Sequence, residues 1–381
     1  MQYFKKAVER FEHNKKLYIG YPPNNQFDYS ELYPLLQYPL NNIGDPFLLR
    51  GPFSTHEYER EVIKWFLKLY AKTGDGWGYV TNGGTEGVLF GMWNGREKLK
   101  NAVVYYSESA HYCAPKCARL LALDKKVIKS QASGEIDYED FERQLEIGKN
   151  AIVIASLGST MTSSVDHVAK LIEILQSKKI PYYIHADAAI EGMILPFIKT
   201  EIPFKLDDGI DSVSISGHKI IGAPMPCGIV LTQENHIAHA EEINIIKDMD
   251  ATITGSRNGF SVALLWYAIK KNGILGFEKN IQGYLEKAKT YCDIFNQHEI
   301  KAWRFERAIT IVLDKLPEEI SKKWRVPSSD TFTTLTALPK LTDDMVYALI
   351  RQIQDYRLNG FVSADLPTLQ YPDRSEELVL S

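Results

Sequence analysis

The sequence predicts an α/β protein with a large, doubly wound and mostly parallel sheet, followed by a smaller α+β unit. Short runs rich in β-branched residues alternate with helical segments, as parallel strands joined by crossover helices do. Near residue 285 the pattern changes to helix, strand, strand, helix. We therefore expect an N-terminal segment over residues 1–50, a large domain over residues 51–284 and a small α+β domain over residues 285–381.

The first helix predicted in the large domain covers residues 55–72. Its large apolar side chains share one face, as in an amphipathic helix: Val62, Trp65, Phe66 and Leu69. A second helical pattern covers residues 166–178. Between and around these helices lie short apolar runs that predict strands, at residues 78–80, 102–107, 151–156, 181–190 and 211–216.

The C-terminal part predicts two helices that flank two strands. The helical patterns cover residues 285–300 and 341–356, and the strand-like runs cover residues 308–316 and 331–338. Thr342 stands directly before an acidic first turn, so it is expected to cap the last helix.

Composition limits the classes of partner. The formal net charge of −4, without a basic stripe, gives no electrostatic footprint for nucleic acid. No run approaches the roughly 18 apolar residues of a membrane helix, and the charged start lacks the apolar core of a signal peptide. The four cysteines show no disulfide framework, and no second pair completes a metal site with Cys113 and Cys117. We expect a cytoplasmic protein with free thiols, without a metal, nucleic-acid or membrane partner.

The glycine-rich stretch TNGGTEG, residues 81–87, lies between a strand-like run and a helical one. Glycines let the main chain approach a ligand closely, and the free N–H groups of a helix start favour an anion such as phosphate. A tight strand-to-helix turn without a ligand is the alternative interpretation, because neither a Walker motif nor a dinucleotide fingerprint is present.

Two charged residues follow predicted strands further along the chain. Asp187, in HADAA, is expected at the carboxyl end of a buried strand, where α/β sheets bind ligands. Lys219 lies 32 residues later among glycines and prolines, and shelter from water would favour its neutral amine, which suits Schiff-base chemistry. A helix cap or solvated loop for Asp187, and a surface position for Lys219, are the alternatives. A phosphate loop, a carboxylate and a lysine in this order are what a pyridoxal phosphate enzyme needs.

Six motifs in matching order carry a resemblance to a known family, from about residue 18 to about residue 375. They are GYP (20–22), NNIGDPF (41–47), TNGGTEG, HADAA, SGHK (216–219) and TGSRNG (254–259). The sequence resembles the group II pyridoxal phosphate-dependent amino acid decarboxylases of fold type I. It is most similar to the branch that contains bacterial histidine decarboxylases and plant serine decarboxylases.

The resemblance implies a role for each matching residue. Lys219 would hold the cofactor aldehyde, Asp187 would pair with the pyridine nitrogen and His111 would stack on the ring. The further cofactor contacts that it implies are Gly84, Thr85, Thr160, Ala189, Ser216, His218, Thr254 and Ser256. Because Thr254 or Ser256 is expected to reach the phosphate from a second subunit, the resemblance also implies a homodimer.

The implied reaction is decarboxylation of an L-amino acid to the amine and carbon dioxide, with histidine as the first candidate substrate and serine as the next. Three positions depart from the family pattern: Ile245 near an expected tyrosine, and Phe260 and Thr334 near expected histidines. These departures leave open a different outcome on the same cofactor, namely oxidative deamination, transamination or elimination. A non-catalytic protein with the same fold is disfavoured, because a scaffold needs no Asp187, His111 and Lys219.

Overall fold

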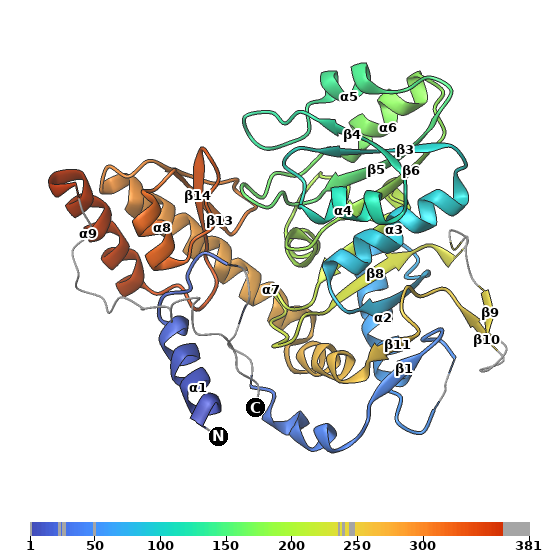
Figure 1. Ribbon diagram of the computed structural model, residues 1–381, viewed down its shortest axis with the longest axis horizontal. Helices are drawn as coiled ribbons and strands as arrows, with labels where there is room; N and C mark the ends of the chain where they lie inside the picture. Colours follow the sequence, from blue (N-terminus) through green and yellow to red (C-terminus); the bar gives the residue numbers. More distant parts are fainter. Residues whose placement is uncertain are drawn as a thin grey trace, which may run out of the picture.

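The computed structural model describes residues 2–21, 24, 28–48, 51–234, 237, 241–243 and 248–360. The chain forms a large unit built on a central sheet and a smaller unit beside it, joined by one long helix (Figure 1). The fold class is therefore as predicted.

Within the described residues, the large unit contains a seven-stranded sheet in the order β2-β8-β7-β6-β5-β3-β4. Its strands are β2 (Trp77–Thr81), β3 (Ala102–Ser107), β4 (Asp124–Ile128), β5 (Asn150–Ser156), β6 (Tyr182–Asp187), β7 (Ser212–Ser216) and β8 (Gly228–Thr232). Strand β8 runs antiparallel to both of its neighbours, and the remaining pairs are parallel. The predicted mostly parallel sheet is confirmed.

Helices cover both faces of this sheet because successive strand residues point to opposite sides. In β3, Val103 and Tyr105 join one core while Val104 and Tyr106 join another. Helices α3 (Gly84–Lys98) and α4 (Cys113–Leu120) pack on the second of these faces. The first face is covered by α2 (His56–Tyr70), α5 (Tyr138–Gln144), α6 (Val168–Ser177) and the first part of α7 (Gly259–Gln297). The predicted helix at residues 55–72 matches α2.

Helix α7 extends into the smaller unit, where its second half packs on a separate core. Its course is broken at Gly273, whose φ of 60° lies outside the helical region. Residues 302–336 contain an antiparallel sheet of β12 (Ala302–Trp303), β13 (Thr310–Asp314) and β14 (Phe332–Thr336), with helices α8 (Glu318–Trp324) and α9 (Asp343–Asn359) beside it. Thr342 caps α9 as predicted. The predicted boundary after residue 284 falls inside α7 and stays a prediction.

The N-terminal part contains helix α1 (Gln2–Lys15), the 3₁₀ helix η1 (Ser30–Gln37) and strand β1 (Asn41–Ile43). Strand β1 pairs antiparallel with β11 (Ser256–Asn258), and β9 (Glu241–Ile243) pairs with β10 (Asp248–Asp250). Three short 3₁₀ helices complete the large unit: η2 (Glu191–Met193), η3 (Leu195–Phe197) and η4 (Leu206–Asp208). None of the helices in the described ranges has the length and apolar character that spanning a membrane requires.

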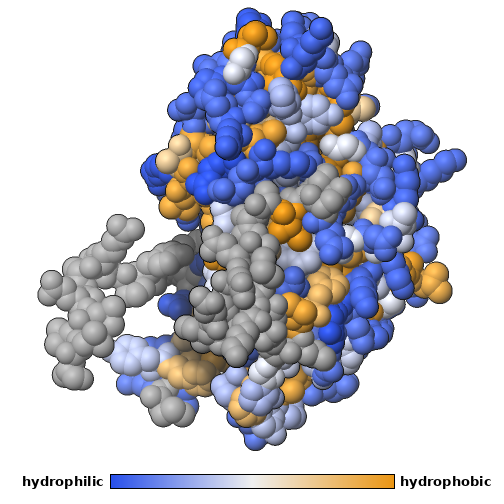
Figure 2. Space-filling view, turned by 90° about the vertical axis from the view of Figure 1, so that its right-hand side faces the viewer, coloured by the Kyte–Doolittle hydropathy of each residue, from blue (hydrophilic) through white to orange (hydrophobic). Residues whose placement is uncertain are grey.

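The face of the molecule shown in Figure 2 is mostly hydrophilic, with hydrophobic side chains in separate patches. Such scattered apolar side chains are normal on a globular protein.

Candidate active site

A cavity of about 1350 Å³ lies at the carboxyl ends of the parallel strands. One wall comes from residues that follow β2, β3, β5, β6 and β7, and the opposite wall comes from β13 and β14 of the smaller unit. Gly20 and Tyr21 line it as well. Open α/β sheets bind ligands at this edge, so the position of the cavity alone makes it the candidate site.

One end of the cavity is built to hold an anion. The glycine-rich turn leads from β2 into the N-terminus of α3, and Gly84 lies so close to β7 that a Cβ there would be 3.0 Å from Ser216 Oγ. Thr85 and Thr254 line the same cavity, and Asn82 Nδ2 donates to Thr254 Oγ1 at 3.3 Å. Main-chain N–H groups of a helix start and hydroxyl groups are the donors that a phosphate needs.

Glu86 lines the cavity close to this turn, but its carboxylate is already used by the protein. Asn82 donates to Glu86 Oε2 through its main-chain N at 2.9 Å and its side-chain amide at 2.8 Å, and Tyr79 OH donates to Oε1 at 3.0 Å. The carboxylate of Glu86 therefore holds the turn in place through hydrogen bonds to Asn82 and Tyr79.

The centre of the cavity brings together Asp187, Lys219 and His111. Burial raises the pKa of the Asp187 carboxyl, while the nearby Lys219 and His111 oppose that rise. Burial likewise lowers the pKa of the Lys219 ammonium, and the charge of Asp187 opposes that shift. A buried carboxylate needs a cationic partner, which a protonated ring nitrogen would supply. A sheltered lysine is readily neutral and hence nucleophilic.

Two histidines face the same space as neutral rings. Burial lowers the pKa of His111, and its Nδ1 accepts from Cys113 N at 3.3 Å. Burial lowers the pKa of His218 too, and its Nδ1 lies 3.0 Å from the carbonyl oxygen of Cys227. Cys227 N also donates to the same Nδ1 at 3.4 Å, so this ring nitrogen lies between a donor and an acceptor of one residue.

The wall from the smaller unit is rich in hydroxyl groups. Thr310, Thr334 and Thr336 contribute side chains to it, and Phe332 adds an aromatic ring. The described residues that line the cavity include no arginine.

Comparison with known proteins agrees with this geometry. A family model described as the pyridoxal-dependent decarboxylase conserved domain matches residues 61–315. The chain belongs to the pyridoxal-dependent decarboxylases. It is 37% identical over 345 residues to a histidine decarboxylase of Mesorhizobium japonicum, which covers 89% of this chain and 93% of that protein. A histidine decarboxylase of Vibrio anguillarum is 35% identical over 366 residues, covering 92% of this chain and 95% of that protein.

The solved structures support the fold. L-methionine decarboxylase from Streptomyces sp. 590 superposes with a TM-score of 0.82 at 22% identity, covering 92% of this chain and 93% of that chain. Sphingosine-1-phosphate lyase of Burkholderia pseudomallei superposes with a TM-score of 0.75 at 15% identity, covering 94% of this chain and 90% of that chain. The fold is thus shared with other decarboxylases and lyases.

Ten of the eleven site residues that the sequence predicts line the cavity: Gly84, Thr85, His111, Thr160, Asp187, Ala189, Ser216, His218, Lys219 and Thr254. Ser256 lies apart from them in β11, where its exposed hydroxyl accepts from Asn41 Nδ2 at 3.2 Å. Of the three departures, Thr334 lines the cavity, Phe260 is buried in the first turn of α7, and Ile245 falls outside the described residues.

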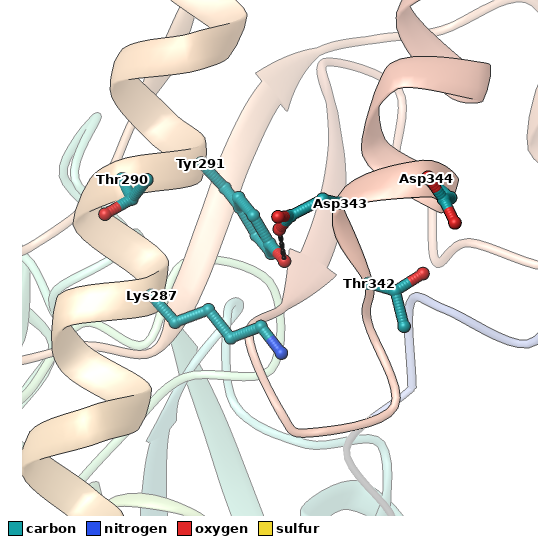
Figure 3. A pocket seen from close by; sticks show the side chains of 6 residues that line it. All are labelled: Lys287, Thr290, Tyr291, Thr342, Asp343 and Asp344. Carbon is teal, nitrogen blue, oxygen red and sulfur yellow. Dashed lines mark hydrogen bonds between the residues drawn. The ribbon is translucent and has the colours of Figure 1, made fainter.

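A smaller pocket of about 550 Å³ lies between α7 and the start of α9 (Figure 3). Its lysine, Lys287, donates to the carbonyl oxygens of Leu338 at 3.3 Å and Pro339 at 3.4 Å. Tyr291 OH donates to Asp343 at 2.7 Å, drawn as a dashed line in Figure 3. Lys287 thus binds the loop before α9, and Tyr291 joins α7 to the start of α9.

Proposed function

We propose that this decarboxylase converts L-histidine to histamine and carbon dioxide, with pyridoxal phosphate bound at Lys219. The observation that carries the proposal is the convergence of Asp187, Lys219 and His111 beside an anion-binding turn in one cavity. Histidine is the proposed substrate because the curated relatives that are 35–37% identical over most of the chain are histidine decarboxylases.

The residues of the cavity would divide the work of holding the cofactor. The turn at Gly84 and Thr85, together with Ser216, would bind the phosphate, and Lys219 Nζ would hold the aldehyde carbon covalently. Asp187 would keep a proton on the ring nitrogen, because its carboxylate is buried and needs that positive charge. When bound, pyridoxal phosphate supplies an electron sink for the pair left behind by carbon dioxide.

Four further residues would orient the cofactor or protonate the substrate carbon. His111 and Ala189 would cover the two faces of the ring, which fixes its plane relative to the substrate. His218, which lines the cavity, would take a proton from water and pass it to the substrate carbon after carbon dioxide leaves. Thr160 would reach the phenolic oxygen of the cofactor. Each role is a proposal for this chain.

We further propose that the protein is a cytoplasmic homodimer. Helix α1 exposes Tyr3 at 88%, Phe4 at 66% and Phe11 at 59%, and none of its residues 2–15 is buried within the chain. A second copy that covers this face would bury that apolar surface.

The four cysteines are buried and free, which fits a reducing compartment such as the cytoplasm. Mass photometry from micromolar to nanomolar protein tests the assembly: an active monomer throughout would contradict the dimer.

The test of the function compares two lysine variants. Each purified holoprotein is incubated with L-histidine, L-serine and L-methionine, and amine and carbon dioxide are quantified by mass spectrometry and gas release. Lys219→Ala should lose at least about 10³-fold in kcat, because the covalent group is gone. Lys287→Ala, which alters the small pocket, should keep wild-type turnover.

The products also distinguish the reaction outcomes. Histamine and carbon dioxide in equal amounts support the proposal, and aldehyde or ammonia in place of the amine would instead support oxidative deamination or transamination. Turnover of serine or methionine but not histidine would overturn the proposed substrate.

A further inference from the structure

A segment near the N-terminus, residues 17–21 with Asn24, connects the smaller unit to the main chain at Lys219. Ile19 is fully buried in the core of the smaller unit. Gly20 presses on the turn before β14, since a Cβ there would lie 2.4 Å from Pro327 Cδ. The carbonyl oxygen of Gly20 accepts from Thr336 Oγ1 at 3.2 Å, and that of Tyr21 accepts from Lys340 Nζ. We call residues 17–21 with Asn24 the crossing segment. Residues 19–21 anchor it to the smaller unit.

At the other end, Asn24 binds two consecutive carbonyl groups. Its main-chain N donates to the carbonyl oxygen of Lys219 at 2.8 Å, and its side-chain amide donates to that of Ile220 at 3.1 Å. The side-chain amide also lies 3.4 Å from Tyr284 OH on α7. Asn24 is only 3% exposed, so water cannot replace these donors.

Lys219 needs such donors because it lies beyond the sheet. Strand β7 ends at Ser216 and β8 begins at Gly228, so the carbonyl groups of residues 219 and 220 have no partner in a strand ladder. The nearest main-chain bonds of the turn join Gly217 to Cys227 and Ala223. Among the described residues, the main-chain donor to the carbonyl oxygen of Lys219 is Asn24.

We propose that Asn24 is a positioning residue for Lys219. By fixing the main chain at Lys219 and Ile220, it holds Nζ at the place in the cavity where the cofactor aldehyde is bound. This inference rests on the proposed role of Lys219. Asn24 does not itself line the cavity, so its loss should impair the covalent step more than the binding of substrate.

The expected effect is a fall in kcat of about 10- to 100-fold for Asn24→Ala, because displacement of a catalytic group by about 1 Å has an effect of this size. The KM for L-histidine should stay within about threefold, since no cavity wall changes. Asn24→Ala and Asn24→Asp both keep the main-chain bond to Lys219 and both lose the side-chain bond to Ile220. In Asn24→Asp a carboxylate oxygen in addition faces the carbonyl oxygen of Ile220. The kcat of Asn24→Asp should fall as well, so this variant tests the positioning role even if Asn24→Ala does not fold.

Asn296→Ala is the matched control. The Asn296 side-chain amide also donates to two carbonyl oxygens, those of Cys292 at 3.0 Å and Ala302 at 2.9 Å, within the smaller unit. A purely structural effect should lower the melting temperature of both variants and leave kcat of both unchanged.

The deciding readout is hydrogen exchange of peptides that cover residues 214–230 in the holoproteins, measured together with the absorbance of the bound cofactor between about pH 6 and pH 9. Asn24→Ala should speed exchange over residues 217–223 and shift the pH at which the cofactor absorbance changes, and Asn296→Ala should do neither. A kcat within twofold of wild type, or an equal loss in Asn296→Ala, would overturn the positioning role. A different result would contradict the proposed function: borohydride would fail to link the cofactor to Lys219 in the wild-type protein. In that case, faster hydrogen exchange in Asn24→Ala would still show that Asn24 holds the turn at residues 217–223.

Discussion

Substitution of the buried Glu59 is expected to destabilise the protein strongly. Glu59 on α2 and Arg257 on β11 form an ion pair with both side chains almost fully buried. The Glu59 carboxylate also accepts from Val80 N at 2.8 Å and from Asn42 Nδ2 at 2.7 Å. Arg257 NH2 donates to the carbonyl oxygen of Gly44 at 2.8 Å. Glu59→Gln would leave the guanidinium buried without a countercharge.

The magnitude follows from this burial. Breaking one side of a buried pair costs about 3–5 kcal/mol. A chain of 381 residues has an unfolding entropy of roughly 0.8 kcal/mol per kelvin, so the melting temperature should fall by about 4–6 °C if the whole chain melts together. Because Val80 leads into the glycine-rich turn and Arg257 follows Thr254, the phosphate end of the cavity should loosen and cofactor affinity should fall too.

The assay is thermal unfolding of the apoprotein by circular dichroism, with cofactor titration alongside. Glu318→Gln is the control, because Glu318 forms an exposed i,i+4 pair with Lys322 and should leave the melting temperature unchanged. The double variant Glu59→Leu with Arg257→Met should melt higher than Glu59→Gln, since it leaves no unpaired charge. A shift as small as that of the control, or a double variant that is no better than Glu59→Gln, would refute the reasoning.

Two further predictions concern buried groups near the sheet. Gly91→Ala should give less soluble protein and melt several degrees lower, because its Cβ would lie 2.1 Å from His185 Nδ1. Gly283→Ala is the control: its Cβ would have open space around it, so its melting temperature should stay the same or rise. Burial raises the pKa of the Glu191 carboxyl to about 8. Between about pH 4.5 and pH 8 the folded chain therefore keeps a proton that the unfolded chain releases. The free energy of unfolding should fall as pH rises through this window, because ionised Glu191 is unfavourable in the folded chain. Glu191→Gln should therefore gain melting temperature relative to wild type as pH rises through that window, and a pH-independent difference would contradict the assigned pKa.

The sheet and its order of elements could be predicted because each strand carries its own local pattern. Runs such as those at residues 102–107 and 151–156 are continuous and apolar, since both faces of the strand are covered. The extent of α7 could not be predicted in the same way. The sequence predicts a helix from residue 285, whereas the structure has α7 from Gly259 to Gln297 with a break at Gly273. Its buried first half lacks the amphipathic period that marks a surface helix.

The residues of the candidate site also differ in whether their position can be predicted from the sequence. Asp187 is the last residue of β6, and Gly84 and Lys219 come shortly after β2 and β7. All three belong to short motifs, so sequence alone predicts their place at the edge of the sheet. Thr310 and Thr336 of the smaller unit carry no such signal. Thr334 and Thr336 point to the cavity because β14 lies opposite the large sheet, and a threonine in a strand-like run is as typical of any β-sheet.

Asn24 shows why the remaining part needs the three-dimensional structure. Nothing in GYPPNN distinguishes one asparagine from the next, and the residue that it binds is 195 positions away. The contact exists because residue 19 is buried in one unit and Lys219 extends from the other, so the crossing segment has to pass between them. A lysine outside the strand ladder cannot be held by its own sheet. Its position is therefore determined by a segment whose sequence shows no sign of that role.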